Sequence, residues 1–284
     1  MVRRGLASSR TEAGHAVLAG LVTVGGAPAT RAGALVAADA AVVVQRGARR
    51  FVSRGGEKLA AALDRFDIDV AGKDCLDAGA STGGFTDCLL QAGAGRVIAV
   101  DVGYGQLAWS LRGDDRVTVM ERTNVRSLTP SGLPYPPAMV VADLSFISLR
   151  TVMTPLVRLS AEPAELVVLV KPQFEAGSAS VDRGGVVRDP SAWRRAMAGV
   201  AAAAAIAGAG VAGAMASSLL GPAGNVEFLL HLRAGRESSQ AAELLDAAVR
   251  EGTTVAAGAA AVAAGSALAG TGPLDEEPTV SAER

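Results

Sequence analysis

Four ionisable residues stand where apolar runs of the chain end, and their types suit proton transfer. Lys171 closes one run, Asp143 follows another, Glu227 directly precedes a third, and Lys58 lies in the segment SRGGEKL. A lysine in a desolvating or cationic site can lose its proton and serve as a general base, whereas an arginine stays protonated. The set therefore predicts a site at which a lysine takes the proton of an attacking hydroxyl while carboxylates hold the lysine in place.

The chain uses lysine rarely, which draws attention to the two lysines in this set. Of the 27 basic residues in 284, only Lys58, Lys73 and Lys171 are lysine. Each residue of the set also has a plain structural interpretation: Lys58 as a surface helix residue, Glu227 as an edge-strand carboxylate, and scarce lysine as codon bias. In an open parallel sheet, however, ligands bind outside the carboxyl ends of the strands, where Asp143 and Lys171 fall.

A glycine-rich turn indicates a second site, for a cofactor. The segment CLDAGASTGGFTD places Asp77 before glycines that lead into a predicted helix, and the exposed amides of a helix start suit an anionic group. The spacing G-x-x-x-G-G differs from the dinucleotide fingerprint, and an acid before the first glycine is expected near the methionine moiety of S-adenosylmethionine. Asp101 ends the next strand, where it can accept two ribose hydroxyls, and Asn124 follows the third strand as a candidate adenine contact. The alternative is that Asp77 and Asp101 cap strand ends without a ligand.

Strand-like and helix-like segments alternate from residue 73 onward. The expected strands are 73–79, 96–103, 116–122, 137–145 and 164–172, with helical segments such as 84–93 and 147–159 between them. This alternation predicts a parallel sheet covered on both faces. Two later apolar runs, 210–220 and 225–233, are joined by only GPAG and predict an antiparallel hairpin at the sheet edge.

The N-terminal part differs in charge from the rest of the chain. Residues 1–58 carry eight arginines and one lysine against three acids, a balance of +6, which leaves −7 for the remainder. A small basic module before an acidic one predicts a polyanion-binding appendage, with a solvated charged face as the alternative. Within it, 5–26 is typical of a helix followed by a strand, and 34–45 of a second strand. The expected fold class is α/β, a Rossmann-like class I methyltransferase sheet with a terminal antiparallel hairpin, preceded by a small α+β RNA-binding domain.

Composition bears on the compartment and on metal sites. Residues 196–226 carry no charged side chain, but their alanine and glycine content favours a helix followed by a buried strand over a transmembrane helix. The N-terminus lacks the apolar core of a signal peptide. Cys75 and Cys88 are too few and too far apart for a disulfide framework or a zinc site, and the two histidines stand alone. We expect a cytoplasmic protein without a metal ion or a membrane segment.

Several motifs together resemble those of the TlyA family, rRNA 2′-O-methyltransferases that also carry the name haemolysin. The motifs are VSRGGEKL, CLDAGASTGGFTD, DVGYGQLAW, VVADLSFISL, LVKPQFE and GPAGNVEFLLHL. The resemblance runs from about residue 2 to about residue 235. The family joins a ribosomal-protein-like αL RNA-binding domain to an FtsJ-like methyltransferase domain with a Lys-Asp-Lys-Glu tetrad.

The resemblance implies a division of the chain. The expected segments are an αL-type RNA-binding domain at 1–46, a basic linker at 47–57, a methyltransferase domain at 58–236, a C-terminal helix at 237–252 and a disordered tail at 253–284. Relatives usually begin with several more residues. We therefore expect either a true start upstream of Met1 or a shortened first helix in the RNA-binding domain.

The resemblance also implies residue roles. The tetrad falls on Lys58, Asp143, Lys171 and Glu227. Cofactor contacts are expected from Asp77, Gly79, Ser81, Thr82, Gly83, Gly84, Phe85, Asp101, Asn124 and Asp143, and phosphate contacts from Arg3, Arg4, Arg10 and Arg31. These roles predict transfer of a methyl group from S-adenosylmethionine to the ribose 2′-oxygen of a cytidine in ribosomal RNA, within the small subunit, the large subunit or both.

Two other classes of function remain as hypotheses. A membrane-active haemolysin would need an insertion segment, for which 196–226 is the only candidate. A non-catalytic RNA-binding protein with a relic cofactor fold would bind the cofactor without turnover. The sequence leaves open which nucleotide is modified and what the oligomeric state is.

Overall fold

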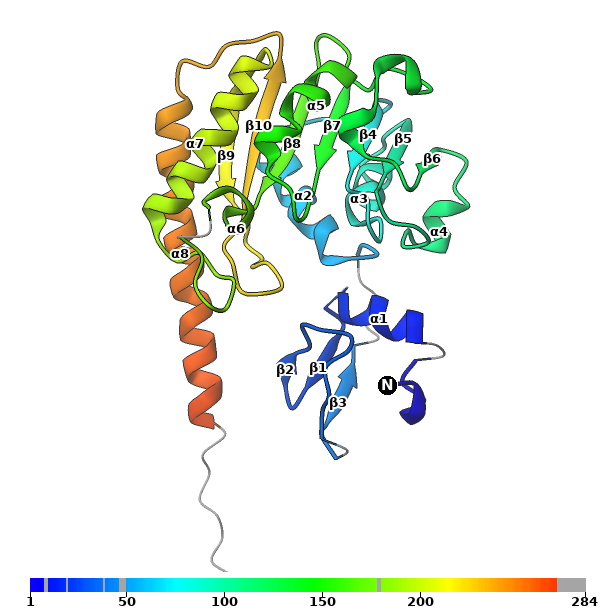
Figure 1. The fold of residues 1–284 in the computed structure, drawn as a ribbon, viewed down its shortest axis with the longest axis vertical. Coiled ribbons are helices and arrows are strands. Elements are labelled where there is room, and N and C mark those ends of the chain that lie inside the picture. The colour runs from blue at the N-terminus through cyan, green and yellow to red at the C-terminus, as the bar shows by residue number, and fades with distance from the viewer. Residues whose placement is uncertain (8–9, 19, 38, 46–49, 178–179, 270–284) are drawn as a thin grey trace, which may run out of the picture.

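A seven-stranded sheet with the order β6-β5-β4-β7-β8-β10-β9 forms the larger part of the molecule. The computed structural model describes residues 1–7, 10–18, 20–37, 39–45, 50–177 and 180–269 (Figure 1). The strands are β4 (Asp74–Ala78), β5 (Arg96–Val100), β6 (Val117–Met120), β7 (Met139–Ala142), β8 (Glu165–Val170), β9 (Ala209–Ala216) and β10 (Phe228–Ala234). Neighbours among β4 to β8 pair in parallel, and β10 is antiparallel to both β8 and β9. The predicted α/β class and terminal antiparallel hairpin are confirmed.

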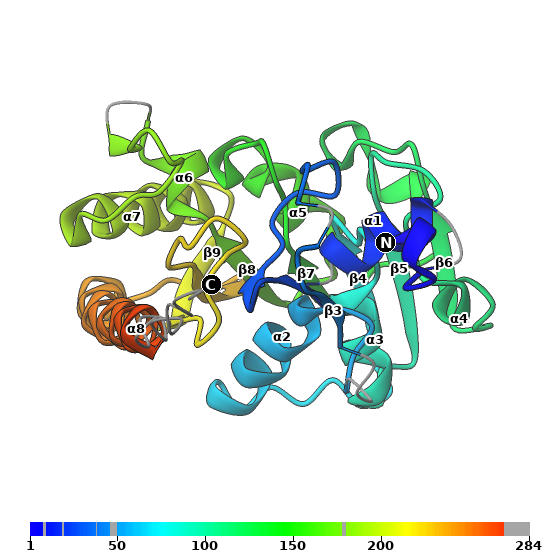
Figure 2. The same cartoon turned by 90° about the horizontal axis from the view of Figure 1, so that it is seen from below.

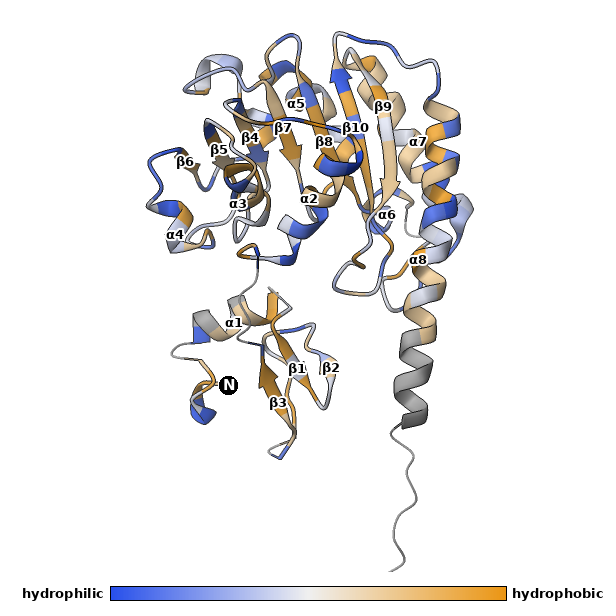
Figure 3. Ribbon diagram, turned by 180° about the vertical axis from the view of Figure 1, so that it is seen from behind, coloured by the Kyte–Doolittle hydropathy of each residue, from blue (hydrophilic) through white to orange (hydrophobic). Residues whose placement is uncertain are grey.

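The central strands are buried on both faces, which explains their continuous apolar sequence. β7 is buried at every position and β8 at every position after the first. Figure 3 shows β7 and β8 in the colours of hydrophobic residues along most of their length. Parallel strands covered by helices on both sides carry unbroken valine, isoleucine and leucine runs for this reason.

Helices cover the two faces and one edge of the sheet (Figure 2). α2 (Arg54–Arg65) and α3 (Gly84–Gln91) pack together on one face, while α5 (Met153–Leu159) and α7 (Pro190–Ile206) pack on the other. α8 (Ala241–Ala269) lies along the edge strand β9. The short helices are α4 (Trp109–Arg112), α6 (Pro172–Glu175), η2 (Val125–Ser127), η3 (Pro130–Gly132) and η4 (Leu149–Thr151).

The connection between β9 and β10 is longer than the sequence predicted. It spans residues 217–227 instead of the four residues GPAG. The chain leaves the sheet at Ser217, whose hydroxyl donates to the Leu219 carbonyl over 2.8 Å, and turns back where Gly221 N donates to Asn225 O over 2.8 Å. Local bonds of this kind offer the chain an alternative to the ladder, so the loop takes up residues that the pattern assigned to strands.

The N-terminal module is a small α+β unit. It contains η1 (Val2–Arg4), α1 (Arg10–Leu18) and a sheet of order β2-β1-β3, formed by β1 (Val22–Val24), β2 (Ala27–Pro28) and β3 (Val42–Val44). Of the strand predicted at 34–45, only the last part pairs with β1. The module faces the carboxyl ends of the parallel strands (Figure 1).

Two predicted boundaries are wrong. The linker predicted at 47–57 already contains the start of α2, because Ser53 caps that helix by accepting from Gly55 N over 3.3 Å. The predicted C-terminal helix ends at Ala269 instead of 252. Alanine has the highest intrinsic helix propensity, so an alanine-rich run without aromatic residues continues the helix. The rest of the predicted tail, 270–284, and residues 47–49 lie outside the described residues.

The uncharged segment 196–226 divides between α7, β9 and the loop that follows. The prediction of a helix followed by a buried strand is therefore confirmed. Within the described part of the chain, no helix combines the length and the apolar character that crossing a membrane requires.

Substitution of Phe228 tests how closely the sheet packs against α7. Its side chain is fully buried, and its ring centroid lies 5.7 Å from that of Trp193. We expect Phe228→Ala to lower the free energy of unfolding by about 3–5 kcal/mol, measured by urea denaturation, because it leaves a cavity in a close-packed core. The exposed Ile206 is the control, and Ile206→Ala is expected to change stability by less than about 0.5 kcal/mol. Equal effects of the two substitutions would contradict this packing.

Candidate active site

The four tetrad residues converge at the carboxyl edge of the sheet although different kinds of element carry them. Asp143 follows β7, and Lys171 follows β8. Because β10 runs antiparallel, its start lies at the same edge, and the pairing of Phe228 with Val170 brings Glu227 to the level of Lys171. Lys58 reaches this edge from the second turn of α2.

Each lysine of the tetrad forms an ion pair with one carboxylate. Lys58 Nζ pairs with Glu227 Oε2, and Lys171 Nζ lies 2.6 Å from Asp143 Oδ1. The pairs differ in exposure: the Lys58 and Glu227 side chains are 9% and 1% exposed, whereas those of Lys171 and Asp143 are 11% and 26% exposed. All four side chains line one cavity of about 230 Å³, which we call the tetrad cavity.

Ser145 and Arg54 are among the residues of the tetrad cavity that the sequence did not single out. Lys171 Nζ donates to Ser145 Oγ over 2.8 Å, so Ser145 fixes the lysine together with Asp143. Arg54 lines the same cavity and donates from Nη2 to the Leu220 carbonyl over 2.8 Å. Ser145 stands two residues after Asp143 in VVADLSF, but a serine after a strand has no distinctive pattern.

A second and larger cavity adjoins the first. It has a volume of about 570 Å³ and is lined by Asp101, Asn124 and the segment 143–147. We call it the cofactor cavity. Leu18, Gly79, Ser81, Asp143 and Ser145 line both cavities, so the turn after β4, the loop after β7 and the end of α1 form their common wall.

The glycine-rich turn after β4 is shaped by close backbone contacts. Gly79 has φ +86, and a Cβ there would lie 2.6 Å from the Asp143 carbonyl oxygen. A side chain at this position would push the β7 loop away from β4. Ser81 N donates to Asp101 Oδ2 over 2.8 Å, and Gly103 N donates to Asp101 Oδ1 over 2.6 Å. Two backbone amides thus fix the Asp101 carboxylate at the wall of the cofactor cavity.

Most of the residues predicted to contact the cofactor line one of the two cavities, but two do not. Thr82, Gly84 and Phe85 line the tetrad cavity, and Asp101 and Asn124 line the cofactor cavity. Asn124 Oδ1 also accepts from Arg126 N over 3.0 Å, which orients its amide. Gly83 instead leaves room for Leu107 and Leu111, which approach it closely.

Asp77 is the other residue that lines neither cavity. It is fully buried beneath the turn, and Thr86 Oγ1 donates to its Oδ2 over 2.7 Å. Burial raises its pKa from 3.8 to about 7, while the hydrogen bond from Thr86 opposes the shift and the Asp143 carboxylate adds to it. Its Oδ1 has no hydrogen-bond donor among the described residues. In this structure Asp77 anchors the start of α3 to β4.

The four arginines predicted to contact phosphate are exposed in the N-terminal module. Arg4 has a structural role as well, because its Nη1 donates to the Ala40 carbonyl over 2.6 Å. This bond joins η1 to the segment before β3. The charges of Arg3, Arg10 and Arg31 lie on the surface of the same module, where a polyanion can reach them.

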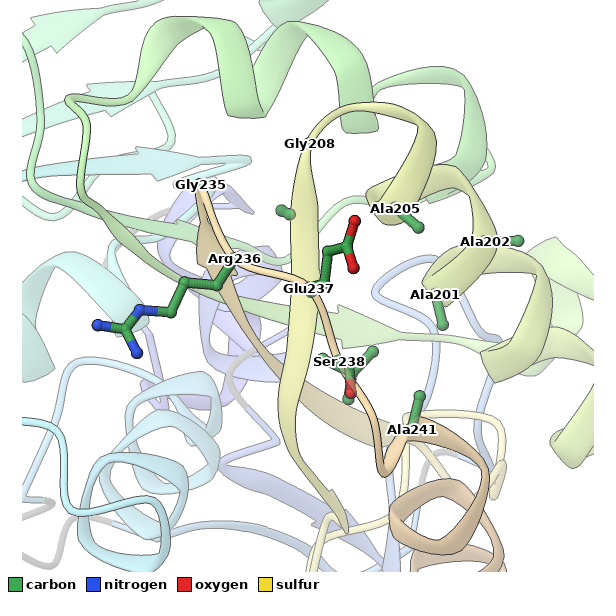
Figure 4. A pocket seen from close by; sticks show the side chains of 12 residues that line it. Ala201, Ala202, Ala205, Gly208, Gly235, Arg236, Glu237, Ser238 and Ala241 are labelled. Carbon is green, nitrogen blue, oxygen red and sulfur yellow. The ribbon is translucent and has the colours of Figure 1, made fainter.

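Reactive groups elsewhere in the described part of the chain form no competing site. Burial raises the pKa of both Cys75 and Cys88 to about 12, which keeps these thiols protonated. Among the described residues, no group of three or more His, Cys, Asp or Glu side chains is arranged to hold a metal ion. A cavity of about 610 Å³ between α7, β9 and the start of α8 is lined largely by alanine and glycine, and its polar lining residues include Glu237 and Ser238 (Figure 4).

The sheet order and the matching family model define a class, the FtsJ-like methyltransferases with a Rossmann-like fold. Residues 51–234 match the FtsJ-like methyltransferase family, and residues 1–42 match the S4 domain. The chain belongs to the TlyA family, in which these two domains are joined.

Three relatives illustrate the similarity. The 16S/23S rRNA (cytidine-2′-O)-methyltransferase TlyA of Mycobacterium tuberculosis is 51% identical over 250 residues, covering 88% of this chain and 93% of that protein. Hemolysin A of Brachyspira hyodysenteriae is 39% identical over 230 residues, covering 80% and 95%. A solved structure from Streptococcus thermophilus, described as a hemolysin, superposes with a TM-score of 0.70 at 36% identity and covers 88% of this chain and 94% of that one.

The raised pKa of Asp77 makes stability depend on pH in a defined direction. Between pH 4 and pH 7 the folded protein holds a proton that the unfolded chain releases, so this carboxyl contributes less stability as pH rises through that window. We expect Asp77→Asn, which cannot ionise, to raise the melting temperature relative to the wild type at pH 8 more than at pH 5. Thermal melts of both proteins across this range measure the difference. A constant difference in melting temperature would show that Asp77 does not titrate there.

Proposed function

We propose that this protein transfers a methyl group from S-adenosylmethionine to the 2′-oxygen of a cytidine ribose in ribosomal RNA. The observation that carries the proposal is the common wall of the two cavities, where Asp143 and Ser145 face both. Such an arrangement suits a methyl donor in the cofactor cavity and an acceptor hydroxyl beside the tetrad. The relatives named as rRNA (cytidine-2′-O)-methyltransferases support the choice of nucleotide and oxygen.

The residues of the cofactor cavity fit S-adenosylmethionine. A volume of about 570 Å³ lies within the range of cavities that hold small molecules. Asp101, held by the amides of Ser81 and Gly103, keeps lone pairs for the two ribose hydroxyls, and Asn124, whose Oδ1 accepts from Arg126 N, is the candidate contact to the base. When bound, this cofactor supplies an electrophilic methyl group on a sulfonium.

Lys171 is the general base in this proposal. Its side chain belongs to the more exposed ion pair and is held from two directions by Asp143 and Ser145. In its neutral form the amine accepts the proton of the 2′-hydroxyl while the new carbon–oxygen bond forms and the carbon–sulfur bond breaks, which leaves S-adenosylhomocysteine. Alignment of hydroxyl and methyl group can itself remove roughly 7–11 kcal/mol of the barrier.

Lys58 and Glu227 have a different role. Their pair is nearly excluded from water, and removing one partner would leave an uncompensated buried charge. Lys58 therefore contributes a fixed positive charge at the wall of the tetrad cavity and joins α2 to the start of β10. Arg54, one turn earlier on the same helix, adds a second cation to this wall.

Replacing Lys171, the proposed base, distinguishes an effect on methyl transfer from an effect on cofactor binding. We expect Lys171→Ala to slow methyl transfer to unmodified ribosomal subunits by about 10²–10⁴-fold, because general base catalysis contributes on that order. Binding of S-adenosylmethionine, measured by calorimetry, should stay close to that of the wild type. Tritiated methyl groups incorporated per minute report the rate.

Lys73 provides the matched control, since it is the one lysine of the chain outside the tetrad. Lys73→Ala should methylate at the wild-type rate. A wild-type rate in Lys171→Ala would reject this lysine as the base. Cofactor binding without turnover by the wild-type protein on either subunit would favour a non-catalytic RNA-binding protein instead.

The exposed arginines of the S4 domain generate a separate prediction about salt. Lys and Arg contacts to phosphates release counterions, so each lost contact should reduce the salt slope of log affinity by roughly 0.7–0.9. We expect the triple variant Arg3→Gln, Arg10→Gln, Arg31→Gln to bind ribosomal subunits more weakly and with a shallower salt dependence. Cofactor binding should not change. Arg4 is left in place because its bond to Ala40 supports the module. An unchanged salt slope would remove these arginines from the RNA contact.

A membrane-active function has less support. The segment 196–226 that such a function would use is divided between α7, β9 and a loop, and most of α7's inner face and β9 are buried. Leakage of liposomes at nanomolar protein, unaffected by Asp77→Ala, would be the observation in its favour.

A further inference from the structure

Two segments carry the residues that form the more exposed ion pair. We call 143–149 the β7 loop and 171–175 the β8 turn. The first begins with Asp143 and the second with Lys171, so the two segments leave neighbouring strands side by side. The β7 loop also contains Ser145 and forms part of the common wall of the two cavities. The conformation of the β7 loop therefore affects the shape of both cavities.

A buried carboxylate joins the far ends of these segments. Glu175, the last residue of the β8 turn, is 7% exposed. Its Oε2 accepts from Ser148 Oγ over 2.6 Å, and its Oε1 accepts from Leu149 N over 2.6 Å. Ser148 Oγ in turn accepts from Arg150 N over 3.2 Å, so every member of this network has a partner. Satisfied buried networks of this kind rigidify the segments they connect.

A ring contact joins the segments between their two ends. The rings of Phe146 and Phe174 lie 5.4 Å apart at 51°. Phe146 has φ +63, a left-handed conformation that a bulky residue rarely adopts, and its side chain is 93% exposed. Strained backbone of this kind persists only where the surroundings hold it. The β7 loop therefore contacts the β8 turn at three points: Lys171 at its start, Phe174 in the middle and Glu175 at its end.

The Glu175 carboxylate is buried, so it is not an ordinary charged side chain in contact with solvent. Burial raises its pKa, while the donors Ser148 and Leu149 and the nearby Arg150 oppose the shift. Removing its carboxylate would leave the Leu149 amide buried without an acceptor, which costs free energy in a packed region. The β7 loop would then lose its anchor at the end away from the ion pair.

We propose that Glu175 is a positioning residue for methyl transfer: it holds the β7 loop so that Asp143 and Ser145 stay against Lys171. It lines neither the cofactor cavity nor the tetrad cavity and acts only through the loop. The inference rests on the proposed function, because it assigns Asp143, Ser145 and Lys171 to the reacting site. It adds a residue from the motif KPQFE that the tetrad does not include.

Two substitutions at this position test the inference. Glu175→Ala removes both acceptors, whereas Glu175→Gln keeps an oxygen for the Leu149 amide. We expect kcat to fall by at least about tenfold in Glu175→Ala, since small misplacements of reacting groups are costly, and by less in Glu175→Gln. The KM for ribosomal subunits should stay within about twofold of the wild type, because phosphate contacts position the RNA elsewhere.

Hydrogen exchange gives a readout that does not depend on turnover. Amides of 143–149 should exchange faster in Glu175→Ala than in the wild type, with Glu175→Gln between them. The matched control is Asp182→Ala, because Asp182 also accepts from two backbone amides, those of Gly184 and Val186, but only within its own loop. We expect the control to change neither kcat nor exchange in 143–149.

The outcomes separate the inference from the proposed function. Unchanged exchange in 143–149, or faster exchange with an unchanged kcat, would overturn the role of Glu175. A general loss of folding, seen as faster exchange throughout β4, β7 and β8 in Glu175→Gln as well, would also overturn it in favour of a purely structural role. A wild-type protein that methylates no ribosomal RNA would contradict the proposed function, and exchange in 143–149 would still decide whether Glu175 holds the loop.

Discussion

The ion pair between Lys58 and Glu227 constrains the arrangement of the whole catalytic domain. It joins residues 169 positions apart, one on α2 and one at the start of β10, in a place that water hardly reaches. Two charges taken out of water are stable only when their partner and geometry are maintained. The pair therefore fixes how α2 lies across the sheet edge, and with it the position of Arg54 and of the chain that leads from the S4 domain.

The remaining site depends on how closely the backbone segments approach each other at this edge. Gly79 allows the Asp143 carbonyl to lie against the turn after β4, which brings the β7 loop between the two cavities. The residue just before the antiparallel β10 adds a carboxylate, since the start of that strand meets the ends of the parallel strands. Charges from four segments can thus be balanced within one small volume, two lysines against two acids.

Much of the fold could be predicted because local patterns decide it. Buried parallel strands require apolar runs, and every one of the five predicted runs between 73 and 172 contains a strand. The predictions that differ from the structure do so for physical reasons. The alanine-rich segment after 252 was predicted to be disordered because it lacks periodicity, but helix propensity and the packing of Val255 and Ala256 against the core extend α8. The cofactor contacts of Gly83 and Asp77 stay predictions: in this structure the first makes room for leucines, and Thr86 donates to the carboxylate of the second.

The sequence by itself determined most element types, their order and the four ionisable residues that meet at the sheet edge, because each of these is encoded in patterns a few residues long. Only the tertiary structure decided the pairings: Lys58 with Glu227, Lys171 with Asp143, and Glu175 with the end of the β7 loop. Arg4 likewise has the same charge as its neighbours, yet a contact 36 residues away gives it a different role. Partners so distant along the chain leave no local signal, since their meeting depends on strand order, strand direction and the burial of both groups.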